Sequence, residues 1–322
     1  MNSTSWFAAL VFALTITLPN LLIMTLGLAM RRWGQINAHF VDIASALVFR
    51  YCLPCLLFFS VSDSSVDISS QLPLIGVGVL VTLLLFVGAE LYARWRIADP
   101  ADQGVFVQGV YRSNMAIMSL ATVANAYGKV GLSVGAVYMG VVTILFNVLA
   151  VITLSRTQQH TSVGARISNM GKTMLKNPLI IALVAAFVYK SLHLPPLPTV
   201  IHHTGDLLAA MALPLALICA GASLDFASML RLSGVSMQAS LGRVIVAPLV
   251  AVAVGLAFGL PPLSMGVLFL MVASPVAAAS YVMAKAMGAN DVAAANILAF
   301  TTVVSMFSMA VGAGMLRAFG LM

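Results

Sequence analysis

Long apolar runs separated by short polar segments cover almost the whole chain of 322 residues. A helical run of about 20 apolar residues is long enough to cross the hydrocarbon core of a bilayer. The runs predict ten membrane-spanning helices, at residues 7–30, 41–62, 72–93, 105–127, 130–154, 176–193, 206–224, 238–258, 262–286 and 290–316. The expected fold class is therefore an all-α integral membrane protein with ten transmembrane helices.

Short sequence landmarks recur about 160 residues apart, which is half of the chain. The recurring pairs are Pro19 and Pro178, Leu53-Pro54 and Leu213-Pro214, Ser113-Asn114 and Ser274-Pro275, and Gly128 and Gly288. Five helices per half is an odd number, so the second half must enter the membrane in the opposite orientation. The sequence thus predicts two inverted five-helix repeats, residues 1–155 and 176–322, joined by a cytoplasmic linker at residues 156–175.

The fourth and ninth predicted spans have the least helical interiors. The fourth contains Arg112, Ser113 and Asn114 near its middle, and the ninth contains Ser274 and Pro275 at a similar depth. Proline removes a backbone donor, and an unpaired backbone group in the bilayer must meet protein, water or ligand. An ordinary proline kink would explain the ninth span alone. Because both halves are interrupted at matching positions, we expect broken crossover helices 4 and 9 at a substrate site.

Composition excludes a soluble globular domain. Hydrophobic residues make up 61% of the chain and charged residues only 8%, against about 25% charged residues in soluble domains. The first apolar run lacks the basic start and the cleavage site of a signal peptide, so we expect it to remain as a spanning helix. The three cysteines lie inside apolar runs, where a disulfide framework or the redox use of Cys52-x-x-Cys55 is not expected.

The net charge of +7 is mainly an orientation signal. The loops after odd-numbered spans contain Arg31, Arg32, Arg94, Arg96, Arg156, Arg166, Lys172, Lys176, Arg231 and Lys285, whereas the opposite side has only Lys129, Lys190 and Arg317. By the positive-inside rule, the odd loops are cytoplasmic and both termini lie outside. Basic residues are not interleaved with aromatic residues on one surface, so no nucleic-acid partner is expected.

Two arginines are predicted to lie deep in the bilayer, Arg112 in span 4 and Arg50 in span 2. No acidic residue is placed at mid-span to pair with them, and Glu90 is expected to pair with Arg94 four residues away. A guanidinium group suits a carboxylate bidentately, which makes a carboxylate substrate the natural partner. The alternatives are bonding to helix-end carbonyls or snorkelling to the cytoplasmic surface, and snorkelling is also the expectation for Arg243 in span 8.

Other polar residues inside the spans are expected to join helices to one another. They are Asn20, Asn147, Asn296, Ser119, Thr143 and Ser305. Ser280 and Asn296 are also candidates for lining the second half of the site. The complete set of candidate substrate-binding residues is Arg112, Ser113, Asn114, Ser274, Pro275, Arg50, Ser280 and Asn296.

The chain resembles the auxin efflux carrier family over essentially its whole length. The resemblance lies in the paired Leu-Pro motifs of spans 2 and 7, the Asn177-Pro178 opening of span 6, and Leu213-Pro-Leu-Ala-Leu217 running into Gly221-Ala-Ser-Leu224. It implies ten helices in two inverted repeats, with helices 4 and 9 crossing as broken segments, so that Asn114 and Pro275 fall at the crossover. Many relatives have a proline-type break where this chain has Asn114.

The resemblance also implies a function and a location. Bacterial members are associated with malate, malonate and related organic anions, and plant members with auxin. The long cytoplasmic loop of many plant carriers is missing, which favours a bacterial-type carrier in the inner membrane. We therefore expect a secondary transporter of small organic anions by alternating access. An auxin-like or other monocarboxylate efflux carrier is the first alternative, and a membrane-embedded sensor is a less favoured one.

An enzyme is not expected. Gly221-Ala-Ser223 is similar to an intramembrane serine-protease turn, but no histidine falls in a later span to activate Ser223. His202, His203 and Asp206 are expected to be solvated loop residues rather than a metal site. No cofactor is expected, and the coupling ion, Na⁺ or H⁺, stays open. The expected partners are the anion and the lipid bilayer, and the amount of apolar surface is compatible with a homodimer.

Overall fold

The computed structural model describes the chain except for residues 1–2, 65–68, 155–175, 193, 226–230 and 232–233. The predicted linker at residues 156–175 therefore lies outside the described residues. Throughout the described part the regular secondary structure is helical, and the β contact it contains is an isolated antiparallel bridge between Ser113 and Val276. The prediction of an all-α membrane protein is confirmed at this level.

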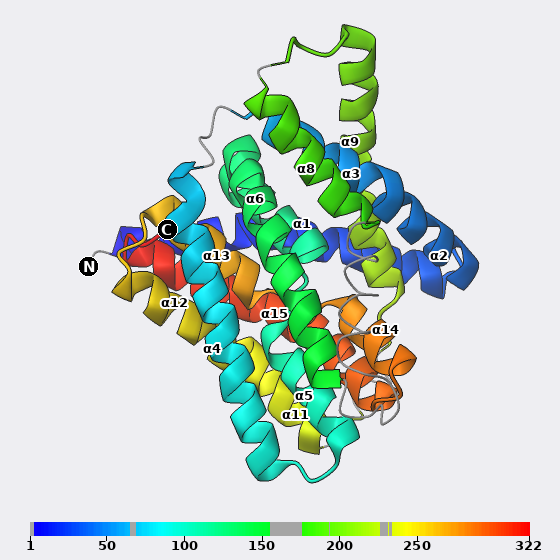
Figure 1. Cartoon of the computed structure of the whole chain (residues 1–322), viewed down its shortest axis with the longest axis vertical. Coiled ribbons are helices and arrows are strands. Elements are labelled where there is room, and N and C mark those ends of the chain that lie inside the picture. Colours follow the sequence, from blue (N-terminus) through cyan, green and yellow to red (C-terminus); the bar gives the residue numbers. More distant parts are fainter. Residues whose placement is uncertain (1–2, 65–68, 155–175, 193, 226–230, 232–233) are drawn as a thin grey trace.

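The helices follow one another along the chain as Figure 1 shows by colour. They are α1 (Ser3–Arg32), α2 (Ala38–Leu47), η1 (Val48–Cys52), α3 (Leu53–Ser62), η2 (Ser69–Gln71), α4 (Leu72–Arg96), α5 (Pro100–Tyr111), η3 (Met115–Ser119), α6 (Leu120–Leu154), α8 (Pro178–Ser191), α9 (Thr199–Ala222), α11 (Gly234–Leu241), η5 (Gly242–Val246), α12 (Ala247–Ala257), α13 (Pro262–Ala273), α14 (Ala278–Ala286) and α15 (Asp291–Ala318).

Seven helical stretches among the described residues are long and apolar enough to cross a membrane. They are Phe7–Arg32, Ala38–Ser62, Ser69–Arg96, Met115–Leu154, Thr199–Ala222, Gly234–Ala257 and Asp291–Ala318, and the shorter α8 and α13 are also apolar. The chain is thus a multi-pass membrane protein.

The bounds of most helices agree closely with the predicted spans, and α9 begins earlier than predicted. It begins at Thr199 rather than at residue 206, so His202 and His203 lie in the helix and not in a loop. The loop prediction was wrong because the first turns of α9 are polar, and hydropathy detects only the apolar part of a helix. Gly128, which marks the predicted boundary between spans 4 and 5, has φ +60°, a conformation that favours glycine, and forms a kink inside α6.

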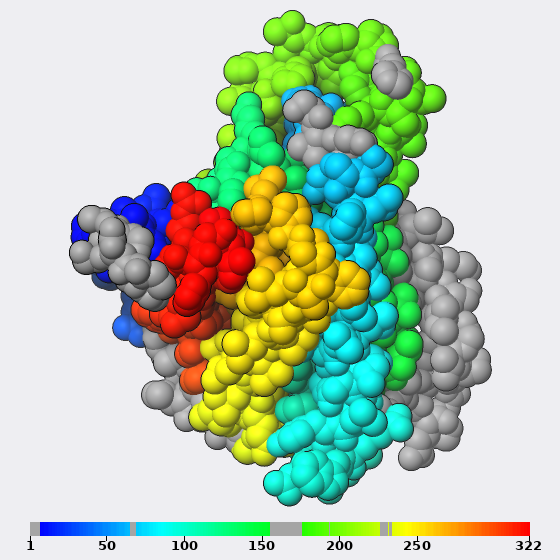
Figure 2. Space-filling view, turned by 90° about the vertical axis from the view of Figure 1, so that its left-hand side faces the viewer, coloured from blue at the N-terminus to red at the C-terminus, as the bar shows by residue number. Residues whose placement is uncertain are grey.

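The helices form two groups that pack against each other. In the first group α1, α2 and α3 pack against α9 and α8 packs against α3, and in the second α4, α5 and α6 pack with α11 to α15. Figure 1 shows α3, α8 and α9 together at the top and right, and Figure 2 shows α4 (cyan) alongside the yellow α12 of the second group. Contacts of α1 with α15 and of α6 with α1 and α3 join the groups. Helix α6 therefore lies at the boundary between them.

Local sequence signals explain several helix starts. Asp99 and Asn177 cap α5 and α8 by accepting hydrogen bonds from the amides of Ala101 and Leu179, both at 2.9 Å. A proline follows each cap at the first helical position, where its missing N–H costs nothing. Helix α13 also begins with a proline, Pro262.

Candidate functional site

Two interruptions of the helices meet in the middle of the molecule. Helix α5 ends at Tyr111 and α13 ends at Ala273, and each is followed by a short extended segment before the chain becomes helical again. The two segments run antiparallel: the amide of Asn114 donates to the carbonyl of Pro275 (2.8 Å), and the amide of Ala277 donates to the carbonyl of Arg112 (3.0 Å). Each interruption therefore satisfies backbone groups that the other leaves unpaired, as a bilayer interior requires.

Side chains secure this crossing from two sides. The hydroxyl of Thr301 on α15 accepts a hydrogen bond from the amide of Val276 (3.2 Å). The hydroxyl of Ser119, on the π-turn after the first break, lies 3.4 Å from the carbonyl oxygens of both Asn114 and Met271. The polar residues near the breaks thus hold the non-helical backbone in place, as expected of small polar residues between membrane helices.

Arg112 is the positive charge closest to the crossing along the chain. Its side chain is 5% exposed and reaches the amide oxygens of Asn147 (2.6 Å) and Gln108 (3.4 Å) and the sulfur of Met283 (3.0 Å). These partners are all neutral, and no ion pair of Arg112 occurs in the described part of the chain. Glu90, by contrast, lies 3.9 Å from Arg94, as predicted.

The prediction that Arg243 snorkels to the membrane surface is wrong. Arg243 is fully buried in η5, and its Nη1 donates to the carbonyl of Val110, in the last turn of α5 (2.9 Å). Its Nε and Nη2 atoms are buried without a hydrogen-bond partner. The prediction failed because η5 faces α5 instead of the bilayer surface, and the direction in which a helix faces cannot be read from depth alone. Arg243 places a second positive charge beside the first break.

A small void lies behind the crossing, on the side of the second helix group. Its lining includes Gln108 of α5 and Ser280 of α14, and its volume is about 10 Å³, close to the space of one water molecule. The Nε2 atom of Gln108 and the Oγ atom of Ser280 are both buried and without partners. Since Gln108 Oε1 faces Arg112, its amide group points the free donor toward the void. The void is too small for an organic anion, and Gln108 and Ser280 are the polar side chains in its mainly apolar lining.

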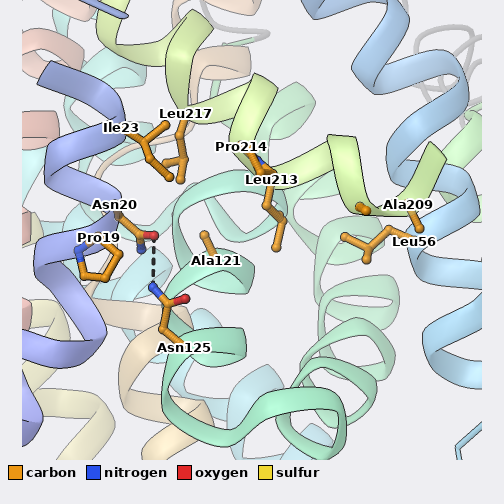
Figure 3. A pocket seen from close by; sticks show the side chains of 11 residues that line it. Pro19, Asn20, Ile23, Leu56, Ala121, Asn125, Ala209, Leu213, Pro214 and Leu217 are labelled. Carbon is orange, nitrogen blue, oxygen red and sulfur yellow. Dashed lines mark hydrogen bonds between the residues drawn. The ribbon is translucent and has the colours of Figure 1, made fainter. Parts of the chain in front are cut away.

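The larger cavity lies between the two helix groups (Figure 3). Its volume is about 260 Å³, and its walls come from α1, α3, α6 and α9. The lining residues are Pro19, Asn20, Ile23, Leu56, Ala121, Asn125, Ala209, Ala210, Leu213, Pro214 and Leu217. The wall from α6 starts at Ala121, seven residues after Asn114, or roughly 10 Å along a helix. The cavity therefore lies close to the crossing.

The polar part of this cavity is a pair of amides that join α1 to α6. Asn125 donates from Nδ2 to the side-chain oxygen of Asn20 (3.1 Å), and the two side chains point toward each other in Figure 3. Asn20 in turn donates to the hydroxyl of Thr122 (3.0 Å). The rest of the lining is apolar or small. Asn20 was expected to be a packing residue and Asn125 was not among the predicted site residues, although Asn20 follows Pro19, one of the recurring landmarks.

Six of the predicted site residues lie at or near the crossing. Ser113, Asn114, Ser274, Pro275 and the backbone of Arg112 form it, and Ser280 lines the small void. The remaining two lie elsewhere: Asn296 donates to the carbonyl of Arg231 (2.7 Å), and Arg50 is exposed on η1, which packs against α8 and α9. None of the eight lines the larger cavity.

The arrangement defines a class of protein: a multi-pass helical membrane protein with two packed helix groups, a cavity between them and two broken helices crossing beside it. The family comparison agrees with this class. Residues 12–312 match the family described as membrane transport protein, the auxin efflux carrier family, and the chain belongs to it. No curated protein matches the chain significantly. The family is one of transporters and not of enzymes.

Proposed function

We propose that this protein is a secondary transporter of small organic anions, with malonate-like and malate-like dicarboxylates as the favoured substrates. The observation that supports this most is the crossing, where the carbonyls of Pro275 and Arg112 accept hydrogen bonds from the opposite break. A substrate that binds there contacts segments from both halves of the chain. Movement of one helix group against the other would then expose the substrate to each side in turn.

The proposal includes ten spans arranged as two inverted five-helix repeats in a bacterial inner membrane. In its support, α5 and α13 begin at prolines about 160 residues apart, and Gly128 and Gly288, also recurring landmarks, both have positive φ. The short α8 and α13, which lie outside the seven longer candidates, each correspond to a predicted span. With odd loops in the cytoplasm, both termini lie outside.

Charge supports an anionic substrate. Arg112 and Arg243 are buried beside the first break, and in the described part of the chain neither contacts a carboxylate. An uncompensated buried guanidinium attracts a carboxylate strongly because little solvent screens it. The larger cavity, at about 260 Å³, lies below the range of roughly 300–1,000 Å³ that is usual for drug-sized ligands.

A monocarboxylate with an apolar body, such as an auxin-like acid, is the second candidate. It is favoured by the lining of the larger cavity, where Ile23, Leu56 and Leu217 offer apolar surface and Asn20 and Asn125 are the amide groups. Apolar walls with a few polar groups are typical of sites that bind an apolar ligand in one orientation. Efflux of such an acid needs the same crossing and the same positive charge.

Uptake into liposomes tests the proposal. Purified protein is reconstituted, and the uptake of radiolabelled malonate, malate and indole-3-acetate is measured by counterflow against the same unlabelled compound. We expect saturable malonate or malate uptake that is absent from protein-free liposomes, and imposed Na⁺ and pH gradients identify the coupling ion. Saturable uptake of indole-3-acetate alone would favour the second candidate. Binding without any uptake would instead point to a sensor.

A further inference from the structure

Three ionisable side chains meet at one end of the first helix group, apart from the crossing and the cavity. They are Asp63, which caps the C-terminus of α3, and His202 and Asp206 on α9. The Nε2 atom of His202 lies 2.9 Å from a carboxylate oxygen of Asp63, and its Nδ1 atom lies 3.0 Å from one of Asp206. Ligand atoms from all three residues lie within 4.8 Å of one another. The two helices thus contribute to a single cluster.

The cluster is electrostatically suited to a cation. Two carboxylates face one imidazole, and Asp63 lies at a helix C-terminus, where the helix dipole disfavours negative charge. A neutral imidazole has one N–H, so it can donate to only one of the two carboxylates. The other ring nitrogen then presents a lone pair beside a carboxylate, and a metal ion is a cation that accepts both as ligands.

We propose that Asp63, His202 and Asp206 bind a divalent transition metal ion, with Zn²⁺ as the best fit. One imidazole nitrogen and two carboxylate oxygens are ligands that Zn²⁺ accepts, and a water molecule completes its tetrahedron. Zinc bonds of about 2.0–2.2 Å bring ligand atoms closer together than 4.8 Å. The side chains are 38–49% exposed, so they are free to adjust and the ion can enter from solvent.

Neighbouring residues already orient the histidine. The ring of Phe59 packs edge-on against the imidazole, with the ring centroids 4.9 Å apart. Gly205, one turn along α9, leaves the space that Phe59 occupies, because a side chain at this position would collide with the aromatic ring. Rings and backbone that hold a ligating histidine in one orientation raise its affinity for metal.

The ion would connect the two helices that form one wall of the larger cavity. Leu56 of α3 and Ala209 of α9 line that cavity, and both lie about two turns from the cluster. A metal ion that joins Asp63 to His202 would fix the spacing of α3 and α9 at this end. This consequence rests on the proposed function, whereas metal binding itself does not.

Calorimetric titration with Zn²⁺ alone tests the site. The purified full-length protein is treated with a chelator, exchanged into metal-free buffer and titrated, and Co²⁺ absorption provides a second measurement of tetrahedral coordination. We expect one ion per chain, and at least about tenfold weaker binding in Asp63→Asn, His202→Gln and Asp206→Asn, since even supporting partners of a ligand contribute that much. His203→Gln is the matched control, because His203 is adjacent and exposed but lies outside the cluster.

Two results would overturn the proposal. One is the absence of Zn²⁺ binding to the wild-type protein, which would leave the three side chains as contacts between α3 and α9 only. The other is equal binding by the wild type and by His202→Gln, which would place the ion on other histidines. Size-exclusion profiles of all variants show whether lost binding reflects unfolding. Because the assay contains no organic anion, its outcome is independent of whether the protein transports one.

Discussion

A buried guanidinium group is costly in a bilayer, and this chain holds two beside its first break. Inserting a central arginine costs at least about 2.5 kcal/mol. Arg112 has three neutral partners, and Arg243 has one carbonyl partner and two unpaired donor atoms. Neither arrangement supplies a counter-charge. We infer that the positive charge has a use that offsets this cost, and attraction of an anion is the use that the proposed function provides.

The charge and the shape of Arg112 can be separated by two substitutions. Arg112→Lys keeps the positive charge but loses the planar fork, whereas Arg112→Gln loses both. We expect Lys to weaken substrate binding and Gln to weaken it further, by about 10- to 100-fold, the range for a lost hydrogen bond to a charged group. Affinity for malonate or malate is measured by calorimetry on purified protein.

Folded yield is the control for these two variants. If Arg112 only ties α5 to Asn147 on α6, Gln should lower the yield of monodisperse protein, and the recovered protein should bind normally. Normal affinity in Arg112→Gln would therefore remove this residue from the site.

At the scale of elements, the crossing depends on two short segments that remain extended. Ser274 and Ala277 have ψ near 161° and 136°, and the segment between them is bonded to the other break instead of continuing α13. Pro275 prevents the helix from continuing because it has no N–H to donate. The first break has no proline, and Arg112, with ψ 94°, ends α5 there. The extended backbone of the first break is therefore held in place by its hydrogen bonds with the second break.

Pro275→Ala tests whether the break is needed. Alanine removes a penalty of about 3 kcal/mol against helix, so we expect α13 to extend toward α14 and transport to fall at least about tenfold, with insertion and folded yield unchanged. Pro262→Ala is the matched control, because Pro262 only begins α13 and is exposed. Uptake in liposomes is the measurement. Unchanged uptake in Pro275→Ala would reduce the break to a packing feature.

A second feature at this scale is the close contact of α1 with α9. A side chain at Gly27 would collide with the backbone of Ile218, and one at Gly221 would collide with the backbone of Met24. Small residues allow membrane helices to approach this closely. Gly221, which suggested a protease turn in the sequence, therefore has a packing role. The hydroxyl of the neighbouring Ser223 donates to the carbonyl of Cys219 (2.8 Å).

Gly221→Ala should destabilise the protein by about 1–3 kcal/mol, the usual cost of overpacking. We expect a lower apparent Tm in detergent, measured by the change in intrinsic fluorescence on heating. Gly76→Ala on α4 is the matched control, since no atom lies within 4 Å of the added carbon, and alanine favours a helix over glycine. Equal melting of Gly221→Ala and wild type would show that α1 and α9 can separate without cost.

At the scale of the whole molecule, the proposed function depends on how the two helix groups sit in the membrane. The cavity between them is bounded by α1, α3 and α9 of one group and α6 of the other. Relative movement of the groups would change its access, so the side on which it opens follows from the orientation of the chain. That orientation rests on the distribution of basic residues.

Cysteine labelling tests this orientation. In a background without Cys52, Cys55 and Cys219, Gln35→Cys lies after the first span and Ser70→Cys after the second, both at exposed positions. A membrane-impermeant maleimide should label Ser70→Cys in intact cells and Gln35→Cys only in inverted vesicles. Labelling of both from one side would contradict the ten-span arrangement.

The sequence by itself determined where apolar helices occur and where two of them are interrupted. These features can be read from short stretches of sequence: the hydropathy of a span, a proline at a helix start, and the polar residues at 112–114. The free-energy cost of an unpaired backbone group in lipid depends mainly on its depth in the bilayer, which the sequence also indicates. Residue types at matching positions in the two halves therefore marked both breaks, and the family resemblance strengthened this reading.

Only the tertiary structure decided which side chains meet. The pairing of Asn20 with Asn125, the burial of Arg243 against Val110, and the approach of Asp63 to His202 join residues from different helices. Each of these contacts depends on how a helix is rotated about its own axis and on which helices lie next to it. Side-chain packing across the whole molecule sets both. Hydropathy averages over all faces of a helix, so it carries no information about that rotation.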